Sequence, residues 1–385
     1  MSSESVRINK DIIERVEQVL QAAHDENVDF NEALNGFDLI TIPTLDPAPD
    51  AKPHKLEPSA VLFWTDRDAY NNEFSYWENA STQEIHRDAK DLIFANGQVP
   101  VFSELVFAMS RGRLVPFVGA GMSQPCNLPL WSTALQEIAK KVGKSDQKAF
   151  TTAIDKRDYI EAAQILWDAD EAQVKSYIRN RFDKSVCTPD KIKGAALLLK
   201  RICSGCVITT NFDNVIESVC GLFEGYMHGV QAGNKFVSKL MKGDRCILKL
   251  HGDAEAAESY IFTGKQYLDG YGSPLDFSKP LPRALRQIFI SQSLLFLGCS
   301  LDQDKTLELF QQVRDDGRKQ GAHFEIPDHF AILPKPKAKS KETSKESQLS
   351  ALGIRPLWYP EGKHQYVEKV LNLVIATVDG RIKPF

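Results

Sequence analysis

The stretch Val115-Pro-Phe-Val-Gly-Ala-Gly-Met-Ser123 decides the fold, because in it an apolar strand runs straight into a turn with little side-chain bulk. The strand is predicted over residues 114–118. Gly119 and Gly121 let the main chain bend sharply and approach a phosphate closely, and a helix after the turn would offer unpaired N–H groups to that phosphate. Taken alone, this pattern is only a weak indication of nucleotide binding.

From this stretch onward, short apolar segments alternate with helical ones. Further strands are predicted at 207–210, 246–250, 294–298 and 329–333, with a sixth near 354–358. Nearly continuous apolar strands that alternate with helices indicate a parallel sheet covered on both faces. The expected fold class is therefore α/β, with a Rossmann-like parallel sheet.

Helices are predicted between these strands and before the first of them. Their ranges are 9–24, 83–96, 103–113, 132–142, 158–168, 171–182, 191–203, 214–223, 281–292, 304–315 and 364–376. The long interval 132–204 separates the first two strands and is expected to be a helical insertion. We expect a mostly helical N-terminal extension over residues 1–100 and a nucleotide-binding domain over 101–385.

Three segments depart from this alternation. Aromatic residues crowd the range 59–79, which predicts a packed surface, and packing within the chain is favoured over a partner. The Pro-rich, charged range 43–58 is expected to loop over the surface. The range 334–347 carries five lysines and two prolines, including Lys335–Lys345, and is expected to be a mobile loop, with nucleic-acid contact as the minority alternative.

The composition indicates a soluble globular protein. The 385 residues are 43% apolar and 25% charged, and the net charge of −4 gives no argument for nucleic-acid or membrane binding. No apolar run is long enough to span a membrane, and the N-terminus lacks a signal-peptide core. The seven cysteines are an odd number and lie mostly in apolar segments, which favours reduced thiols. We therefore expect a cytoplasmic protein.

Polar side chains follow four of the predicted strands at the point where each strand ends. In an open parallel sheet, ligands bind beyond the carboxyl ends of the strands. Four strands that deliver small, polar or titratable residues to one edge are harder to explain by packing than any single motif. These residues are Ser123, Asn211, Asp213, His251, Ser300 and Asp302.

Each motif also has a structural explanation when it is taken singly. Asn211 and Asp213 are residue types that cap a helix, and one is predicted from residue 214. A lone histidine such as His251 is more often structural, although its position at a strand end before glycine favours chemistry. The first turn lacks the third glycine of the dinucleotide fingerprint, so hydride transfer is a poor interpretation.

Together and in this order, four motifs resemble those of the sirtuin family of NAD-consuming enzymes. The motifs are Gly119-Ala120-Gly121-Met122-Ser123, Thr210-Asn211-Phe212-Asp213, His251-Gly252 and Gly298-Cys299-Ser300-Leu301. Asn127-Leu-Pro-Leu-Trp131 also resembles the continuation of the first motif in bacterial sirtuin-like domains. The resemblance covers residues 100 to 376 and leaves the first hundred residues unexplained.

The resemblance implies a role for each matching residue. The turn of Gly119, Ala120, Gly121 and Ser123 would hold the pyrophosphate of NAD. Asn211 and Asp213 would line the nicotinamide–ribose pocket, and Asp213 would bond the carboxamide. His251 would be the base for a ribose hydroxyl or an attacking water. Asn211, Asp213 and His251 are the expected catalytic residues. Gly298 and Ser300 would contact the adenosine half, and Asp302 would bond its ribose hydroxyls.

Departures from the family pattern shape the expected activity. Protein deacylases of the family carry two C-x-x-C pairs that bind zinc, whereas Cys203-Ser-Gly-Cys206 is a single pair, so no zinc is expected. Trp131 also stands near the position where deacylases have an arginine. Water would then be the nucleophile, and the products would be nicotinamide and ADP-ribose.

This zinc-less pattern resembles the NAD-depleting effectors of bacterial antiphage defence. That resemblance implies an NAD+ hydrolase, acting as a homo-oligomer or with a partner such as a HerA-type hexameric ATPase. The alternatives are an NAD-dependent protein deacylase or ADP-ribosyltransferase, and a non-catalytic scaffold that binds NAD or ADP-ribose.

Overall fold

The structure is a computed structural model, and it describes residues 10–36, 39–42, 54–143, 146–203, 205–221, 230–233, 245–302, 305–319, 326–383 and 385. Its internal contacts divide the chain into two compact units, Met1–Arg87 and Asp88–Phe385. The division lies earlier than the expected boundary at residue 100. Ala89 and Ile93, near the end of the long helix α4 (Arg67–Ala95), are buried in the main core of the second unit.

The first unit is mostly helical and has a small aromatic core. Phe30, Phe63 and Tyr70 form this core, and the Arg67 guanidinium lies 3.4 Å from the centre of the Phe63 ring. The predicted packing of the aromatic range 59–79 within the chain is thus confirmed for Phe63, Tyr70, Phe74 and Trp77, whereas Trp64 and Tyr76 are exposed. Its elements before α4 are α1 (Lys10–Asp25), α2 (Val28–Asn35), β1 (Ile40–Ile42), β2 (His54–Leu56) and α3 (Pro58–Thr65). Residues 43–53 of the expected surface loop lie outside the described residues.

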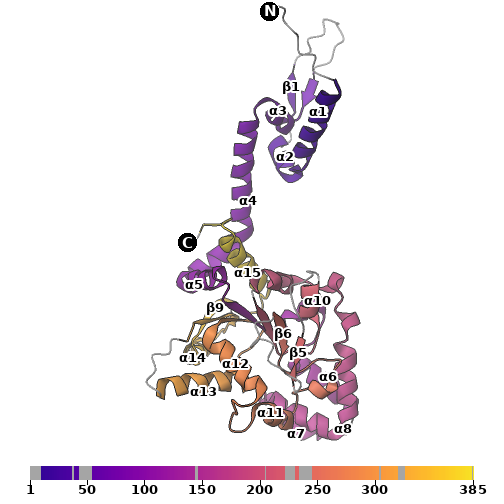
Figure 1. Cartoon of the computed structure of the whole chain (residues 1–385), viewed down its shortest axis with the longest axis vertical. Helices are drawn as coiled ribbons and strands as arrows, with labels where there is room; N and C mark the ends of the chain where they lie inside the picture. Colours follow the sequence, from indigo (N-terminus) through magenta and orange to yellow (C-terminus); the bar gives the residue numbers. More distant parts are fainter. Residues whose placement is uncertain are drawn as a thin grey trace, which may run out of the picture. The chain divides into compact units, whose positions relative to one another are not determined.

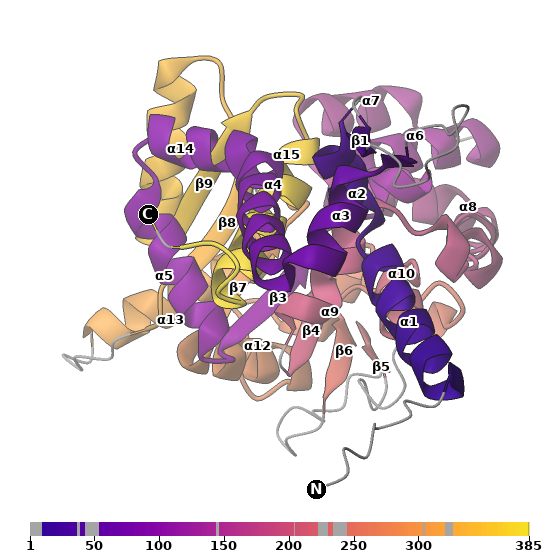
Figure 2. The same ribbon diagram turned by 90° about the horizontal axis from the view of Figure 1, so that it is seen from above.

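The second unit is built on one parallel seven-stranded sheet, and the predicted fold class is confirmed. Figure 2 shows its strands side by side, in the order β5-β6-β4-β3-β7-β8-β9. Every pairing in this sheet is parallel. The strands are β3 (Leu114–Val118), β4 (Cys206–Thr209), β5 (Val230–Ala232), β6 (Cys246–Lys249), β7 (Ser293–Leu297), β8 (His329–Lys335) and β9 (Ile354–Pro360).

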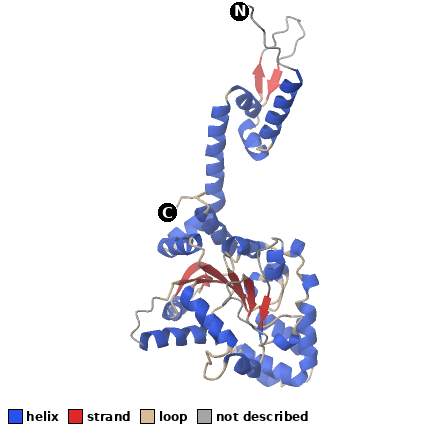
Figure 3. Cartoon of the chain, viewed as in Figure 1, coloured by secondary structure: helices blue, strands red, loops and turns tan. Residues whose placement is uncertain are grey.

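Helices cover both faces of this sheet, as Figure 3 shows, because alternate residues of each strand belong to different cores. In β3, Leu114 and Val118 pack on one face, whereas Val115 and Phe117 pack on the other. The first face is covered by α5 (Val99–Ser110), α6 (Trp131–Val142), α8 (Tyr159–Arg181), α9 (Leu199–Ile202), α10 (Val215–Gly221) and α15 (Gln365–Val378). The second face is covered by α11 (Gly264–Tyr271), α12 (Pro280–Ser291), α13 (Lys305–Lys319) and α14 (Lys339–Ala351).

The predicted helical insertion lies between β3 and β4, where α6, α7 (Gln147–Asp155) and α8 pack together (Figure 1). Two helices were expected at 158–168 and 171–182, and this is confirmed, because α8 consists of two helical segments that meet at a kink. At Asp170 the backbone leaves the helical region, with φ −162° and ψ 87°, and its carboxylate accepts a hydrogen bond from Gln173 N–H at 3.0 Å. Asp170 therefore caps a new helical segment inside α8.

Two predictions about local structure are wrong. The range 191–203 is mostly short 3₁₀ turns, and only α9 within it is an α-helix. The lysine-rich range 334–347 is not a mobile loop, because it contains the end of β8 and most of α14. Lys335 and Lys339 pair with Glu342, and the Trp358 indole donates to Glu346 at 3.2 Å. These contacts attach the segment to the neighbouring strands.

Candidate functional site

The strand order places a topological switch between β3 and β7. From β3 the chain moves outward in one direction to β4 and β6, and it then returns to the other side of β3 as β7, followed by β8 and β9. Six of the strands thus follow the doubly wound order, and β5 adds one more strand at the edge. In such sheets the ligand crevice lies at the carboxyl ends of the strands that flank the switch. The turns at 119–123 and 298–302 occupy that position.

These two turns pack directly on one another through glycines. A Cβ atom on Gly119 would lie 2.6 Å from the Gly298 carbonyl oxygen, and one on Gly121 would lie 2.9 Å from Gly298 Cα. A Cβ on Gly298 would lie 2.5 Å from Met122 N, and Gly298 has a φ of +66°. No side chain fits at these distances. The glycines are therefore required for contact between the two turns, whether or not a phosphate binds.

Most main-chain N–H groups of the first turn, those of Gly119, Gly121, Met122 and Ser123, are already engaged within the protein. Gly119 N–H donates to the Leu297 carbonyl at 2.9 Å, and Gly121 N–H donates to the Gly298 carbonyl at 3.0 Å. The N–H groups of Met122 and Ser123 donate within the 3₁₀ turn. A pyrophosphate held here would have to use other donors or replace these bonds. The predicted phosphate grip by Gly119, Ala120, Gly121 and Ser123 stays a prediction.

Asn211 is buried in the turn after β4 and contacts the first motif. Its Nδ2 donates to Ser123 Oγ at 3.1 Å, and its N–H donates to Thr209 Oγ1 at 3.0 Å. Its Oδ1 is also buried and accepts no hydrogen bond from the residues that the structure describes. An unsatisfied buried acceptor costs about 1–3 kcal/mol. A donor supplied by a ligand would remove that cost.

Asp213 lies in the same turn and is also buried. Its Oδ1 accepts a hydrogen bond from Val215 N–H at 3.0 Å, at the start of α10. The alternative that Asp213 stabilises the start of this helix is therefore confirmed, and it does not exclude ligand binding, because a carboxylate has further lone pairs. Burial raises the pKa of Asp213, and the neighbouring Lys249 ammonium opposes that shift.

His251 lies in the turn after β6, two residues beyond the end of the strand, in a buried aromatic environment. Its Nε2 is 2.8 Å from the Tyr267 hydroxyl, and Tyr267 stacks on Tyr271 with ring centres 5.7 Å apart. The edge of the Trp131 ring system meets the His251 ring at 5.8 Å and 80°. Tyr267 thus fixes the orientation of the imidazole, and the sequence motifs did not point to it.

Lys249 is a second residue that the motifs did not single out. It ends β6, two residues before His251, and its side chain is fully buried. Its Nζ donates to the Phe212 and Asp213 carbonyls at 3.0 and 2.7 Å, and it pairs with Glu217 and Asp253. A lysine in an otherwise apolar strand, just before the histidine motif, is the signal that could have revealed it.

A narrow pocket, with room for about 30 Å³, lies beside Asn211 and Asp213. Its walls come from the first turn, from α6 and α8 of the insertion, and from the turn after β4. Trp131 and Phe262 are among the lining residues and stack with ring centres 5.4 Å apart. The volume is about that of one water molecule. A nicotinamide ring could enter only if these aromatic side chains moved apart.

The residues after β7 have a different environment from those after β4 and β6. Ser300 is exposed, and the Asp302 side chain is 44% exposed. The Asp302 carboxylate pairs with Arg157 at 3.2 Å and with Lys345 at 2.8 Å. It is therefore occupied by two cations, and the predicted contact with ribose hydroxyls would have to displace them or share the carboxylate with them.

The structure thus divides the predicted residues into two groups. The inner group is Asn211, Asp213 and His251, and the outer group is Ser300 and Asp302. Lys249 connects two members of the inner group. It bonds to the Asp213 carbonyl, and it lies two residues before His251 on the same chain segment. Asn211 and Asp213 therefore line the narrow pocket, and His251 lies behind one of its walls, in contact with Trp131.

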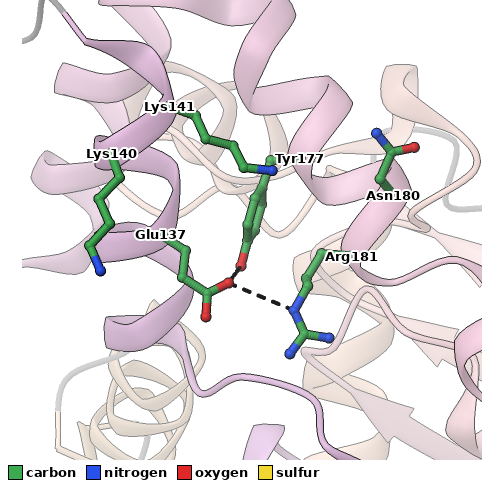
Figure 4. A pocket seen from close by; sticks show the side chains of 6 residues that line it. All are labelled: Glu137, Lys140, Lys141, Tyr177, Asn180 and Arg181. Carbon is green, nitrogen blue, oxygen red and sulfur yellow. Dashed lines mark hydrogen bonds and ion pairs between the residues drawn. The ribbon is translucent and has the colours of Figure 1, made fainter.

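A larger hollow of about 470 Å³ lies between α6 and α8 (Figure 4). In it the Tyr177 hydroxyl donates to Glu137 at 2.6 Å, and Arg181 Nε lies 3.7 Å from the same carboxylate oxygen. Burial and the Glu137 carboxylate raise the pKa of Tyr177. None of the predicted site residues lines this hollow, although Tyr177 also lines the narrow pocket.

The described residues contain no group of three His, Cys, Asp or Glu side chains that could hold a metal ion. Cys203 follows α9, Cys206 begins β4, and the Cys203 thiol donates to the Cys206 carbonyl at 3.2 Å. Within the same described ranges, no helix has the length and apolar character that crossing a membrane requires.

Comparison with known proteins gives three kinds of match. The family model described as a SIR2-like domain matches residues 205–357. The NAD(+) hydrolase ThsA of Acinetobacter baumannii (strain 532279) is 25% identical over 246 residues, which are 63% of this chain and 47% of ThsA. Defense-associated sirtuin 2 of Bacillus subtilis is 24% identical over 249 residues, 64% of this chain and 23% of that protein. The chain thus spans less than half the length of either relative.

A solved structure titled as a Sir2 homologue in complex with NAD is also similar, with 13% identity and a TM-score of 0.34. The match covers 72% of this chain and 94% of that one. The matched family region contains three of the four sequence motifs, from Thr210 to Leu301. The resemblance predicted from these motifs is confirmed over residues 205–357, the range that matches the SIR2-like domain.

Proposed function

We propose that this chain hydrolyses NAD+ to nicotinamide and ADP-ribose and acts as an NAD-depleting effector in antiphage defence. The names of the two relatives, an NAD(+) hydrolase and a defense-associated sirtuin, support this proposal. The observation that carries it is the inner group: the orphaned Oδ1 of Asn211 and the buried Asp213 belong to residues that line one pocket, and Trp131, which lines the same pocket, contacts the buried His251.

The residues of the inner group fit the two halves of the reaction. The Asp213 carboxyl and Asn211 Oδ1 would accept hydrogen bonds from the carboxamide of nicotinamide and from the ribose. When the bond from ribose C1′ to the nicotinamide nitrogen breaks, its electron pair leaves with nicotinamide and positive charge develops on the ribose. Water then bonds to C1′ and gives up a proton, and His251, oriented by Tyr267, would accept it.

The test is direct detection of products. Purified protein is incubated with NAD+, alone and with any partner isolated with it, and nicotinamide and ADP-ribose are separated by chromatography. We expect equal amounts of both products, and His251→Ala and Asn211→Ala should each abolish their release. NAD+ binding without product release would contradict the proposal and favour a scaffold. Release that depends on an acetylated peptide would favour a deacylase.

The assembly is a separate proposal that also rests on the resemblance. We propose a homo-oligomer, with a hexameric ATPase of the HerA type as a partner in trans. The native mass of the protein, measured alone and after co-expression with such an ATPase, tests both parts. A monomer that forms no complex would contradict them.

A further inference from the structure

The buried ammonium of Lys249 is the most unusual charged group in the described part of the second unit. Lys249 ends a strand whose other residues, Cys246, Ile247 and Leu248, are apolar and buried. A buried charge is very costly unless it is paired and hydrogen-bonded. The folded chain can therefore hold a lysine here only if specific partners pair with its ammonium.

The partners of Lys249 lie on three different segments that build the site. The Phe212 and Asp213 carbonyls belong to the turn that carries the inner residues after β4. Glu217, at 2.7 Å, belongs to α10, and Asp253, at 3.0 Å, follows the His251-Gly252 motif. One ammonium thus connects the Asn211–Asp213 turn, the helix after it and the segment that carries His251.

The two carbonyl bonds fall on the turn that positions the inner group. Phe212 stands between Asn211 and Asp213, so the bond to its carbonyl restrains the stretch of main chain that carries both side chains. The same segment is also held from the other side, because Ala254 N–H donates to the Phe212 carbonyl at 3.2 Å. Lys249 itself is not among the residues that line the narrow pocket. Its position therefore suits support of the site rather than contact with a ligand.

The charges around Lys249 are unbalanced. Three carboxyl groups, on Asp213, Glu217 and Asp253, surround one ammonium. Burial raises the pKa of both Asp213 and Glu217, and the ammonium lowers both. Glu255 and its partner Lys184 contribute a further pair of charges on the outer side of Asp253 and Glu217. Among the described residues, the other groups that act on these carboxyls are Ser123, Cys126, Cys187, Cys220 and Tyr260.

We propose that Lys249 is the positioning residue of this site: its ammonium holds the Asn211–Asp213 turn in register with the segment that carries His251. The consequence for catalysis rests on the proposed NAD+ hydrolysis. The positional role itself does not, because the same bonds would order the turn in a protein that only binds NAD. Removal of the ammonium should therefore loosen the turn and slow turnover more than it weakens binding.

The main experiment compares Lys249→Met with the wild-type protein. We expect kcat for nicotinamide release to fall about 30-fold or more while KM changes less than about threefold, because the reacting groups lose their alignment. Amide hydrogen exchange at residues 210–214 and 251–254 should become faster. Lys305→Met is the matched control, because its ammonium is exposed and pairs only with Glu308 among the described contacts.

The pH profile separates this role from a general loss of stability. Loss of the ammonium raises the pKa of Asp213, so the acid limb of turnover should move to higher pH in Lys249→Met. Glu217→Gln removes a negative neighbour of Asp213, so its acid limb should move to lower pH. Glu217→Gln keeps the carbonyl bonds of Lys249 and should fold if Lys249→Met does not.

The outcomes distinguish the two proposals. If wild-type protein releases no nicotinamide, the proposed function fails, and hydrogen exchange still tests the positional role. Unchanged exchange at 210–214 in a folded Lys249→Met variant would overturn the role, as would unchanged kcat in an active protein. If Lys249→Met does not fold and Glu217→Gln does, the pH profile of Glu217→Gln is the test. An acid limb that does not move to lower pH in that variant would overturn the positional role of Lys249.

Discussion

The inner and outer groups lie at the carboxyl ends of the same sheet, yet their environments differ sharply. Asn211, Asp213 and His251 are 6%, 4% and 3% exposed, whereas the Asp302 side chain is 44% exposed. The inner side chains bond to other buried groups of the site, and Asp302 pairs with Arg157 and Lys345. The comparison suggests that chemistry belongs to the inner group and that the outer group adjusts substrate affinity.

The largest expected effect is that of Asn211→Asp. The substitution keeps the shape of the side chain, removes the donor to Ser123 and places a second carboxyl beside Asp213. We expect nicotinamide release to fall at least about 100-fold, as for loss of one aligned donor in a catalytic site. Ser300→Ala, on the exposed outer turn, is the control and should stay within about threefold of wild type. If Asn211→Asp and Ser300→Ala lose similar amounts of turnover, the inner and outer groups do not differ in function.

Asp213→Asn should lower turnover about 10-fold and raise thermal stability. Burial raises the pKa of Asp213 in the folded protein above its ordinary value of 3.8, so the folded state favours the protonated acid. The protonated Asp213 carboxyl therefore stabilises the folded state fully at pH values below the pKa of Asp213 in the unfolded chain. This stabilisation is lost as the pH rises through the pKa of Asp213 in the folded protein. An asparagine does not ionise, so the Tm advantage of the variant should grow with pH across this window. Melting curves at several pH values check this, and a pH-independent difference would contradict it.

Tyr267→Phe is expected to reduce kcat about 10-fold. It removes the hydroxyl that lies 2.8 Å from His251 Nε2, and it keeps the ring that stacks on Tyr271. Steady-state kinetics measure the loss, and Tyr76→Phe, at a position that is 72% exposed, is the control. If Tyr267→Phe keeps full turnover, the hydroxyl does not orient the imidazole during the reaction.

The smallest expected effect is that of Asp302→Asn. The pair with the exposed Arg157 contributes about 0–1 kcal/mol. Lys345 is mostly buried but keeps its bond to the Leu301 carbonyl, so Tm should change little. We expect KM for NAD+ to rise two- to threefold, on the order expected for one weak contact, with kcat unaltered. A large fall in kcat would contradict this prediction and would show that Asp302 takes part in turnover, as expected for the inner group.

Sequence reasoning located the sheet well because its strands are apolar on both faces. Leu114–Val118 is buried at every position, so its apolar run was visible without any periodicity. β5 escaped because three residues, Val230–Ala232, are too few to show a pattern. The motifs at the strand ends could be placed together because parallel strands present their carboxyl ends at one edge.

The prediction from composition was wrong where a few contacts order a polar segment, in the range 334–347. The range 334–347 has few apolar residues, but lysine and glutamate are good helix formers, and α14 forms there. Leu349, fully buried, attaches that helix to the second core. Lys249 escaped for the opposite reason: charged residues are rarely fully buried, and its partners come from turns whose proximity only the fold determines.

The contact between the turns after β3 and β7 has a consequence for the order of events during synthesis. β3 pairs along its whole length with β7, from Leu114 beside Ser293 to Val118 beside Leu297. The first turn therefore lacks the second turn, against which its glycines pack, until the ribosome has made the chain through about residue 302. Such long-range pairing forms late in folding. If the chain destroys NAD, an unfinished copy still attached to a ribosome should be harmless to the cell that makes it.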